Sequence, residues 1–153
     1  MLRGAINHID LTVIDPITSR PFYDAVLGYI GFERFRVAGD ENLLWHSTIQ
    51  GQRLFSVALR KASPEGARKQ CDRNSPGLHH LAFHATSRED VDGLFELLEQ
   101  IGATLLDAPA EYPQYAPDYY AVFFTDPDGL KLEFVHMPKP PVIETGSGDS
   151  GKS

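Results

Sequence analysis

One order of secondary-structure elements is predicted twice along this chain, and this repeat restricts the fold more than any other feature. Each half reads as a strand, a helix and then three short strands, because apolar residues alternate in the strands and recur at helical spacing between them. Residues 61–77 separate the halves, since their proline, glycine and charged residues can supply neither a core strand nor an amphipathic helix. The sequence therefore predicts an α+β fold of tandem βαβββ modules, over residues 1–60 and 78–137.

The helices have the clearest limits. Asp15 and Pro16 mark the start of the first, and Ser87 with Asp90 forms a capping-box-like start to the second. An apolar stripe along the second helix ends at Gly102. The expected helices are residues 17–31 and 87–102, and the expected strands are 5–14, 34–39, 43–49, 53–60, 77–86, 103–108, 119–126 and 130–137.

Composition restricts the partners. A chain of 153 residues that is 42% hydrophobic can bury a proper core. Its net charge is −7, and the charged residues are interspersed and do not form blocks. The sequence therefore gives no sign of a basic surface that would bind nucleic acid or an anionic membrane. We expect no signal peptide and no membrane span, because the N-terminus lacks the necessary regions and no apolar run approaches about 18 residues. The expected partners are a small molecule and a second copy of the chain.

A single cysteine, Cys71, excludes an intrachain disulfide, so a cytoplasmic location is the default expectation. Cys71 lies in the polar segment between the modules and has no patterned neighbour that would activate a nucleophile. We interpret it as an ordinary thiol of the linker, residues 61–77.

Four short motifs occur in a fixed order: NHIDLTVID, FYDAVLG with GFE just after it, LHHLAFHA, and DPDGLKLEFV. Together they resemble the vicinal oxygen chelate superfamily, which includes glyoxalase I, bleomycin-resistance proteins, fosfomycin-resistance transferases and extradiol dioxygenases. The resemblance covers about residues 4–137 and leaves out residues 138–153, which read as a flexible tail. It implies the glyoxalase/bleomycin-resistance/dihydroxybiphenyl-dioxygenase fold, in which the two modules form a cup-shaped mixed sheet.

Strand alternation identifies the side chains that the helices do not cover. Successive residues of a strand point to opposite faces, so an apolar set against the helix leaves the other set on the open face. By this argument His8, His80 and Glu133 lie on open faces, whereas His79 lies on the covered side and is structural. The helix-facing residues are Ile9, Leu11, Val13, Leu81, Phe83, Ala85, Leu132 and Phe134.

The resemblance implies a metal site at these open-face residues. His8, His80 and Glu133 each fall where the superfamily's motifs carry a ligand. Two imidazoles and one carboxylate suit a single divalent ion such as Zn, Ni, Mn or Fe(II). His84 lies about 13 Å along the strand from His80, which is too far to bind the same ion.

Glyoxalase I-like members carry a fourth ligand in the first module. Aligning QGQRLFSVA with DGLKLEFVH places Phe55 opposite Glu133, and phenylalanine cannot bind a metal. The expected shell therefore resembles that of the fosfomycin transferases and extradiol dioxygenases, with open positions for water and substrate. Ordinary lactoylglutathione lyase activity is not expected.

Two functions remain open. The first is a metal-dependent lyase, isomerase, dioxygenase or thiol transferase that acts on a small oxygen-bearing molecule, and the second is bleomycin-resistance-type drug binding without catalysis. Either function needs a cavity, for which the candidate residues are Trp45, Phe55, Tyr112 and Tyr115. The candidate catalytic residues are Tyr119 and Tyr120, as an acid or base, and His84, as a substrate contact or part of the cavity wall. Superfamily members commonly dimerise, so we expect a homodimer, with the cup built within one chain or by exchange of modules between chains.

Overall fold

The computed structural model describes residues 3–39, 42–49, 52–69 and 71–138. The predicted tail falls almost entirely outside these residues. In the first module the elements are β1 (His8–Val13), α1 (Pro16–Tyr29), β2 (Phe32–Phe35), β3 (Leu43–Ile49) and β4 (Gln52–Lys61). A short 3-10 helix, η1 (Gly66–Arg68), follows. In the second module the elements are β5 (Leu81–His84), α2 (Arg88–Gln100), β6 (Thr104–Glu111), β7 (Tyr120–Thr125) and β8 (Lys131–His136).

Each module contains one four-stranded mixed sheet, and the two sheets have the same topology. The strand orders are β1-β4-β3-β2 and β5-β8-β7-β6. The first strand of each module pairs in parallel with the last, and the other pairs are antiparallel. The predicted repeat of βαβββ units is therefore confirmed.

Local sequence explains where both helices begin. The Asp15 carboxylate accepts a hydrogen bond from the backbone N–H of Ile17 at 3.3 Å, and Pro16 occupies the first turn, where no N–H is needed. The Ser87 hydroxyl accepts the N–H of Asp90 at 3.2 Å. These caps are the ones that the sequence predicts.

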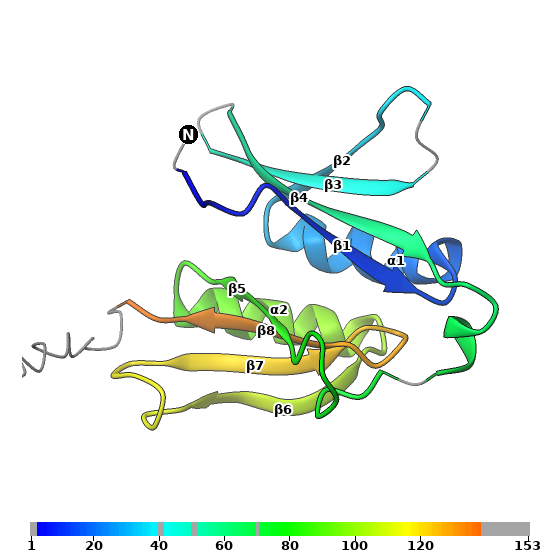
Figure 1. Cartoon of the computed structure of the whole chain (residues 1–153). Coiled ribbons are helices and arrows are strands. Elements are labelled where there is room, and N and C mark those ends of the chain that lie inside the picture. Colours follow the sequence, from blue (N-terminus) through cyan, green and yellow to red (C-terminus); the bar gives the residue numbers. More distant parts are fainter. Residues whose placement is uncertain (1–2, 40–41, 50–51, 70, 139–153) are drawn as a thin grey trace, which may run out of the picture.

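The two modules share one hydrophobic core, which contains the helix-facing residues of both sheets. The Phe32 and Phe83 rings meet across the modules with centroids 5.9 Å apart, and Tyr29 lies edge-on to Phe134 at 6.3 Å. Helix α1 accordingly lies between the first sheet and the second module (Figure 1). Because both helix-facing sides meet in one core, the open faces of the two sheets point away from each other.

Polar contacts join the modules at the turn between β7 and β8. The Tyr23 hydroxyl of α1 donates to the buried Asp126 carboxylate at 2.8 Å, and the backbone N–H of Ile14 donates to Asp128 at 2.7 Å. Gly129 completes this turn at a φ of 91°, which glycine adopts without strain. The motif DPDG thus closes a hairpin and also docks the first module.

Within the described residues, no helix combines the length and the apolar character that crossing a membrane requires.

Candidate functional site

The open face of the second sheet carries a buried carboxylate. Glu133 on β8 is only 2% exposed, and an ionised carboxylate at such a position requires polar partners. His80 Nε2 lies 3.2 Å from Glu133 Oε2. The Tyr119 hydroxyl donates a hydrogen bond to the other carboxylate oxygen, Oε1. Glu133 is therefore held between an imidazole and a phenol.

These groups face a cavity of about 320 Å³. Lys131 lies on the same face of β8 as Glu133, and its Nζ sits 3.9 Å from the centre of the Phe123 ring, within the range of a cation–π contact. The cavity thus combines a carboxylate, two imidazoles, a cation and aromatic walls. Its lining residues are His79, His80, Tyr115, Tyr119, Phe123, Lys131 and Glu133.

The His80–Glu133 pair has the spacing of two ligands of one metal ion. Bonds of 2.0–2.2 Å that meet at tetrahedral or right angles separate the two donor atoms by about 2.8–3.6 Å. The observed separation of 3.2 Å between Nε2 and Oε2 falls inside that interval. Burial is the largest influence on the pKa of His80 and lowers it, although Glu133 acts in the opposite direction. The lowered pKa favours the neutral imidazole, which is the form that metals bind. His80 and Glu133 therefore have the chemistry and the spacing of two ligands of one divalent ion.

His8, the third predicted ligand, lies elsewhere in the same chain. It is exposed at the start of β1, on the open face of the first sheet, and its Nδ1 lies 2.9 Å from Asn7 Oδ1. Because the two open faces point apart, one chain does not bring His8 to the His80–Glu133 pair. Accordingly, the described part of the chain contains no cluster of three or more potential metal ligands.

The predicted structural role of His79 is wrong. Strand β5 begins at Leu81, so the alternation that was extended back to His79 does not operate there. His79 is exposed and lines the same cavity as His80. The two Nδ1 atoms lie 2.7 Å apart, with ring centroids at 4.9 Å. Adjacent histidines therefore share one site.

The alignment that placed Phe55 opposite Glu133 is also wrong. Phe55 packs edge-on against Phe32 in the shared core, at 5.3 Å between centroids, and so does not line the cavity. When His8 is matched with His80, Ala58 corresponds to Glu133, because Ala58 pairs with Asp10 and Glu133 with Ala82. The alignment assumed equal strands, whereas β4 has 10 residues and β8 has 6. Alanine offers no ligand atom either, so a shell without a fourth ligand stays our prediction.

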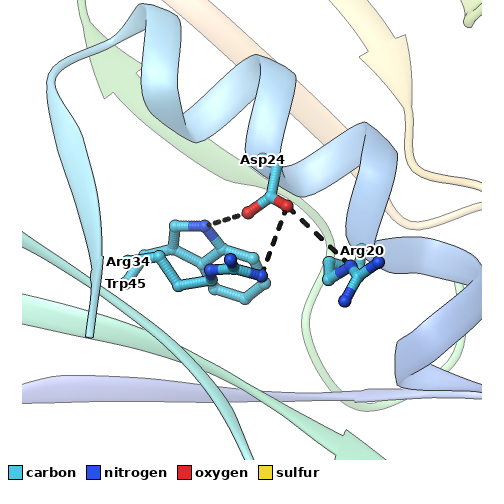
Figure 2. A network of polar contacts seen from close by, with 4 residues as sticks. All are labelled: Arg20, Asp24, Arg34 and Trp45. Carbon is cyan, nitrogen blue, oxygen red and sulfur yellow. Dashed lines mark hydrogen bonds and ion pairs between the residues drawn. The ribbon is translucent and has the colours of Figure 1, made fainter. Parts of the chain in front are cut away.

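Trp45 is part of the core and does not line the cavity. It is 1% exposed on β3, and its indole N–H donates to Asp24 Oδ1 of α1 at 3.0 Å. Figure 2 shows Arg34 and Arg20 beside the same carboxylate. Arg34 Nη1 lies 3.6 Å and Arg20 Nε 3.9 Å from Asp24 Oδ2. The predicted cavity role of Trp45 is replaced by a role in fastening β3 to α1.

The segment before β7 supplies aromatic residues to the open face. Tyr115 and Tyr119 line the cavity, and Tyr112 stacks on Tyr115 with centroids 5.9 Å apart and an interplanar angle of 19°. Burial, reinforced by the hydrogen bond to Glu133, raises the pKa of Tyr119 well above its usual value. Tyr119 is therefore a neutral hydrogen-bond donor at physiological pH.

The other two catalytic candidates lie outside the cavity. Tyr120 packs on the helix-facing side, where its hydroxyl donates to Asp92 at 2.7 Å and the Arg88 guanidinium lies 5.1 Å from its ring centre. His84 is exposed at the end of β5 and is not among the lining residues. Lys131, which was not among the predicted site residues, shares the face of Glu133 two positions earlier, so alternation could have identified it.

Comparisons with known proteins agree with this architecture. A family model of the Glyoxalase/Bleomycin resistance protein/Dioxygenase superfamily matches residues 5–134. The uncharacterized protein YqjT of Bacillus subtilis is 31% identical over 131 residues, which are 85% of this chain and 97% of that protein. A solved glyoxalase/bleomycin resistance protein/dioxygenase domain from Frankia sp. EAN1pec is 30% identical with a TM-score of 0.67, covering 89% of this chain and 98% of that one. The chain therefore belongs to the glyoxalase/bleomycin resistance protein/dioxygenase superfamily, also known as the vicinal oxygen chelate superfamily.

Proposed function

We propose that this protein is a divalent-metal-dependent enzyme whose site is assembled from two copies of the chain. His80 and Glu133 of one copy would bind the ion together with His8 of a second copy. The observation that carries the proposal is the buried Glu133 carboxylate, held 3.2 Å from His80 Nε2 on an open face. His8 lies on the opposite open face of the same chain, so a second chain is the natural source of the third ligand.

The cavity suits a small oxygen-bearing organic substrate. Its volume of about 320 Å³ lies at the lower end of ordinary ligand sites. A bound divalent ion would supply an electrophile for two adjacent substrate oxygens. Tyr119 offers a phenol proton next to Glu133, and aromatic side chains form part of the cavity wall. Lys131 places a positive charge where an anionic oxygen of the substrate can approach.

Drug binding without catalysis is the second candidate function. The stacked Tyr112–Tyr115 pair, with Tyr119 edge-on to Tyr115 at 5.3 Å, offers flat aromatic surface to a planar ligand. Drug binding does not explain why a buried carboxylate faces an imidazole. For this reason we favour the metalloenzyme.

Metal content measured by mass spectrometry on protein purified without chelators tests the first function. His8→Ala, His80→Ala and Glu133→Ala should each lose the ion, whereas His84→Ala is a matched control on the same open face outside the cavity. A wild-type protein that stays metal-free after incubation with Zn, Ni, Mn or Fe(II) would favour drug binding instead.

A mixing experiment tests the assembly from two chains. Neither His8→Ala nor Glu133→Ala should bind metal alone, but a dimer of one chain of each contains one intact site. Random pairing of equal amounts should restore about a quarter of the wild-type sites, since half of the symmetric dimers would be mixed and each would hold one intact site of two. No recovery after unfolding and refolding the mixture would contradict a site shared between copies.

A further inference from the structure

The residue immediately before each predicted ligand histidine contacts the Nδ1 atom of that histidine. Asn7 Oδ1 lies 2.9 Å from His8 Nδ1, and His79 Nδ1 lies 2.7 Å from His80 Nδ1. Both contacts engage Nδ1 and leave Nε2 for another partner, and Nε2 of His80 is the atom that lies next to Glu133. The same arrangement therefore recurs in both modules.

The Asn7 contact determines which nitrogen of His8 carries the hydrogen. An amide oxygen only accepts hydrogen bonds, so His8 Nδ1 must donate. In the neutral ring this leaves a lone pair on Nε2, which is the form that a metal ligand requires. Asn7 thus favours, in the metal-free chain, the tautomer of His8 that a metal would bind.

The His79 contact can work in two ways. Without metal, His80 Nε2–H can donate to the Glu133 carboxylate, and His80 Nδ1 then accepts from His79 Nδ1–H. When Nε2 binds a metal, His80 must move its hydrogen to Nδ1 and donate it to His79 Nδ1. His79 then carries its own hydrogen on Nε2, so each neutral ring keeps one proton and none is released. An imidazole at position 79 serves both states because it can either donate or accept.

We propose that Asn7 and His79 are positioning residues that hold His8 and His80 with Nε2 directed at one metal ion. The inference rests on the metal site proposed above. Partners of this kind fix the tautomer and ring orientation of ligand histidines, and their removal costs about 10–100-fold in metal affinity. Asn7 and His79 are both exposed in the single chain, so we expect a loss at the lower end, about tenfold for each.

The test measures Zn²⁺ affinity of the full chain by competition with a chelator. Asn7→Leu and His79→Leu keep the branching at Cγ but remove the hydrogen-bonding atom, and both should weaken binding. Asn7→Asp retains the acceptor, and His79→Asn places an amide atom where Nδ1 was, so both should bind more tightly than the leucine variants. His84→Leu controls for loss of an exposed histidine. Thermal midpoints of the metal-free variants should match wild type.

Nitrogen-15 NMR of the imidazole rings, at a pH where both are neutral, gives a readout independent of catalysis. His8 should carry its hydrogen on Nδ1 with and without Zn²⁺, and His80 should move it from Nε2 to Nδ1 when Zn²⁺ binds. In Asn7→Leu the metal-free His8 should lose its preference for Nδ1–H.

The outcomes separate the two proposals. If wild type binds Zn²⁺ and the leucine variants bind it equally well, the positioning role is refuted and the metal site stands. If wild type binds none of the candidate metals, both are refuted.

Discussion

Replacing Tyr23 with phenylalanine tests the contact that joins the modules. Tyr23 is 1% exposed, and its hydroxyl donates to Asp126, which is 3% exposed, at 2.8 Å. A hydrogen bond to a charged group contributes about 1.5–3 kcal/mol. The backbone N–H groups of Asp128 and Leu130 still donate to Asp126 Oδ1 in the variant, whereas Oδ2 loses the Tyr23 hydroxyl. We expect Tyr23→Phe to reduce the free energy of unfolding at pH 7 by about 2 kcal/mol.

The loss should depend on pH in a definite direction. Burial raises the pKa of Asp126, while the Tyr23 hydrogen bond lowers it. A carboxyl whose folded pKa exceeds its unfolded value stabilises the fold when protonated, and this stability is lost as pH rises from the ordinary 3.8 to the folded pKa. Tyr23→Phe removes an influence that lowers the pKa and so widens that window. The difference from wild type should shrink as the pH falls toward 3.8.

Urea unfolding of both proteins across this pH range measures the effect. Tyr120→Phe is the matched control, because its hydroxyl also donates to a carboxylate, at 2.7 Å from Asp92, but at an exposed position where water can replace it. The control should lose under about 1 kcal/mol. Equal losses in the two variants, or a Tyr23→Phe loss that does not vary with pH, would refute the reasoning.

Three further predictions concern other contacts. An added Cβ at Gly93 would lie 2.2 Å from the Tyr29 hydroxyl, so Gly93→Ala should destabilise the chain by about 1–3 kcal/mol. In a Tyr29→Ala background the same substitution should stabilise α2 by about 1 kcal/mol. A double-mutant cycle of unfolding free energies measures both effects. Asp24→Ala leaves the buried Trp45 indole N–H without its acceptor and should cost about 1–3 kcal/mol by the same assay, with the fluorescence of the single tryptophan as probe. Burial and the carboxylates of Asp126 and Asp72 raise the pKa of Cys71, so its alkylation at pH 7 should be slower than that of a model thiol, and a rate equal to the model's would contradict this.

Most of the fold was predictable because the local signals agree. The caps at Asp15 and Ser87, the helical stripes and the turn ending at Gly129 are each determined by residues near one another in the sequence. Limits of strands were less accurate, since β5 starts four residues later than predicted and β6 extends to Glu111. A strand ends where its pairing partner ends, and that information is not local.

The errors at the site follow from the same cause. Alternation located Glu133 correctly on an open face, because β8 is regular and fully paired. Alternation failed for His79, which precedes the paired part of β5. The alignment of the two modules failed for Phe55, because its strand is longer than the corresponding strand of the second module. Whether the two open faces meet depends on how the modules pack against each other. The sequence pattern does not reveal this packing, because the helix-facing sides are apolar in any arrangement. The sequence therefore left the sharing of ligands between chains open.

The parallel pairing of each module's first and last strands imposes an order of events during synthesis. Residue His8 pairs opposite Ser56, so the first sheet cannot close until nearly the whole module has left the ribosome. Closure still leaves the apolar side of that module uncovered, because Phe32 and Phe22 find their partners in Phe83 and Phe124 of the second module. A nascent chain that ends in the segment between the modules therefore exposes an apolar surface. This surface is open to aggregation until the second module has been synthesised and packs against it.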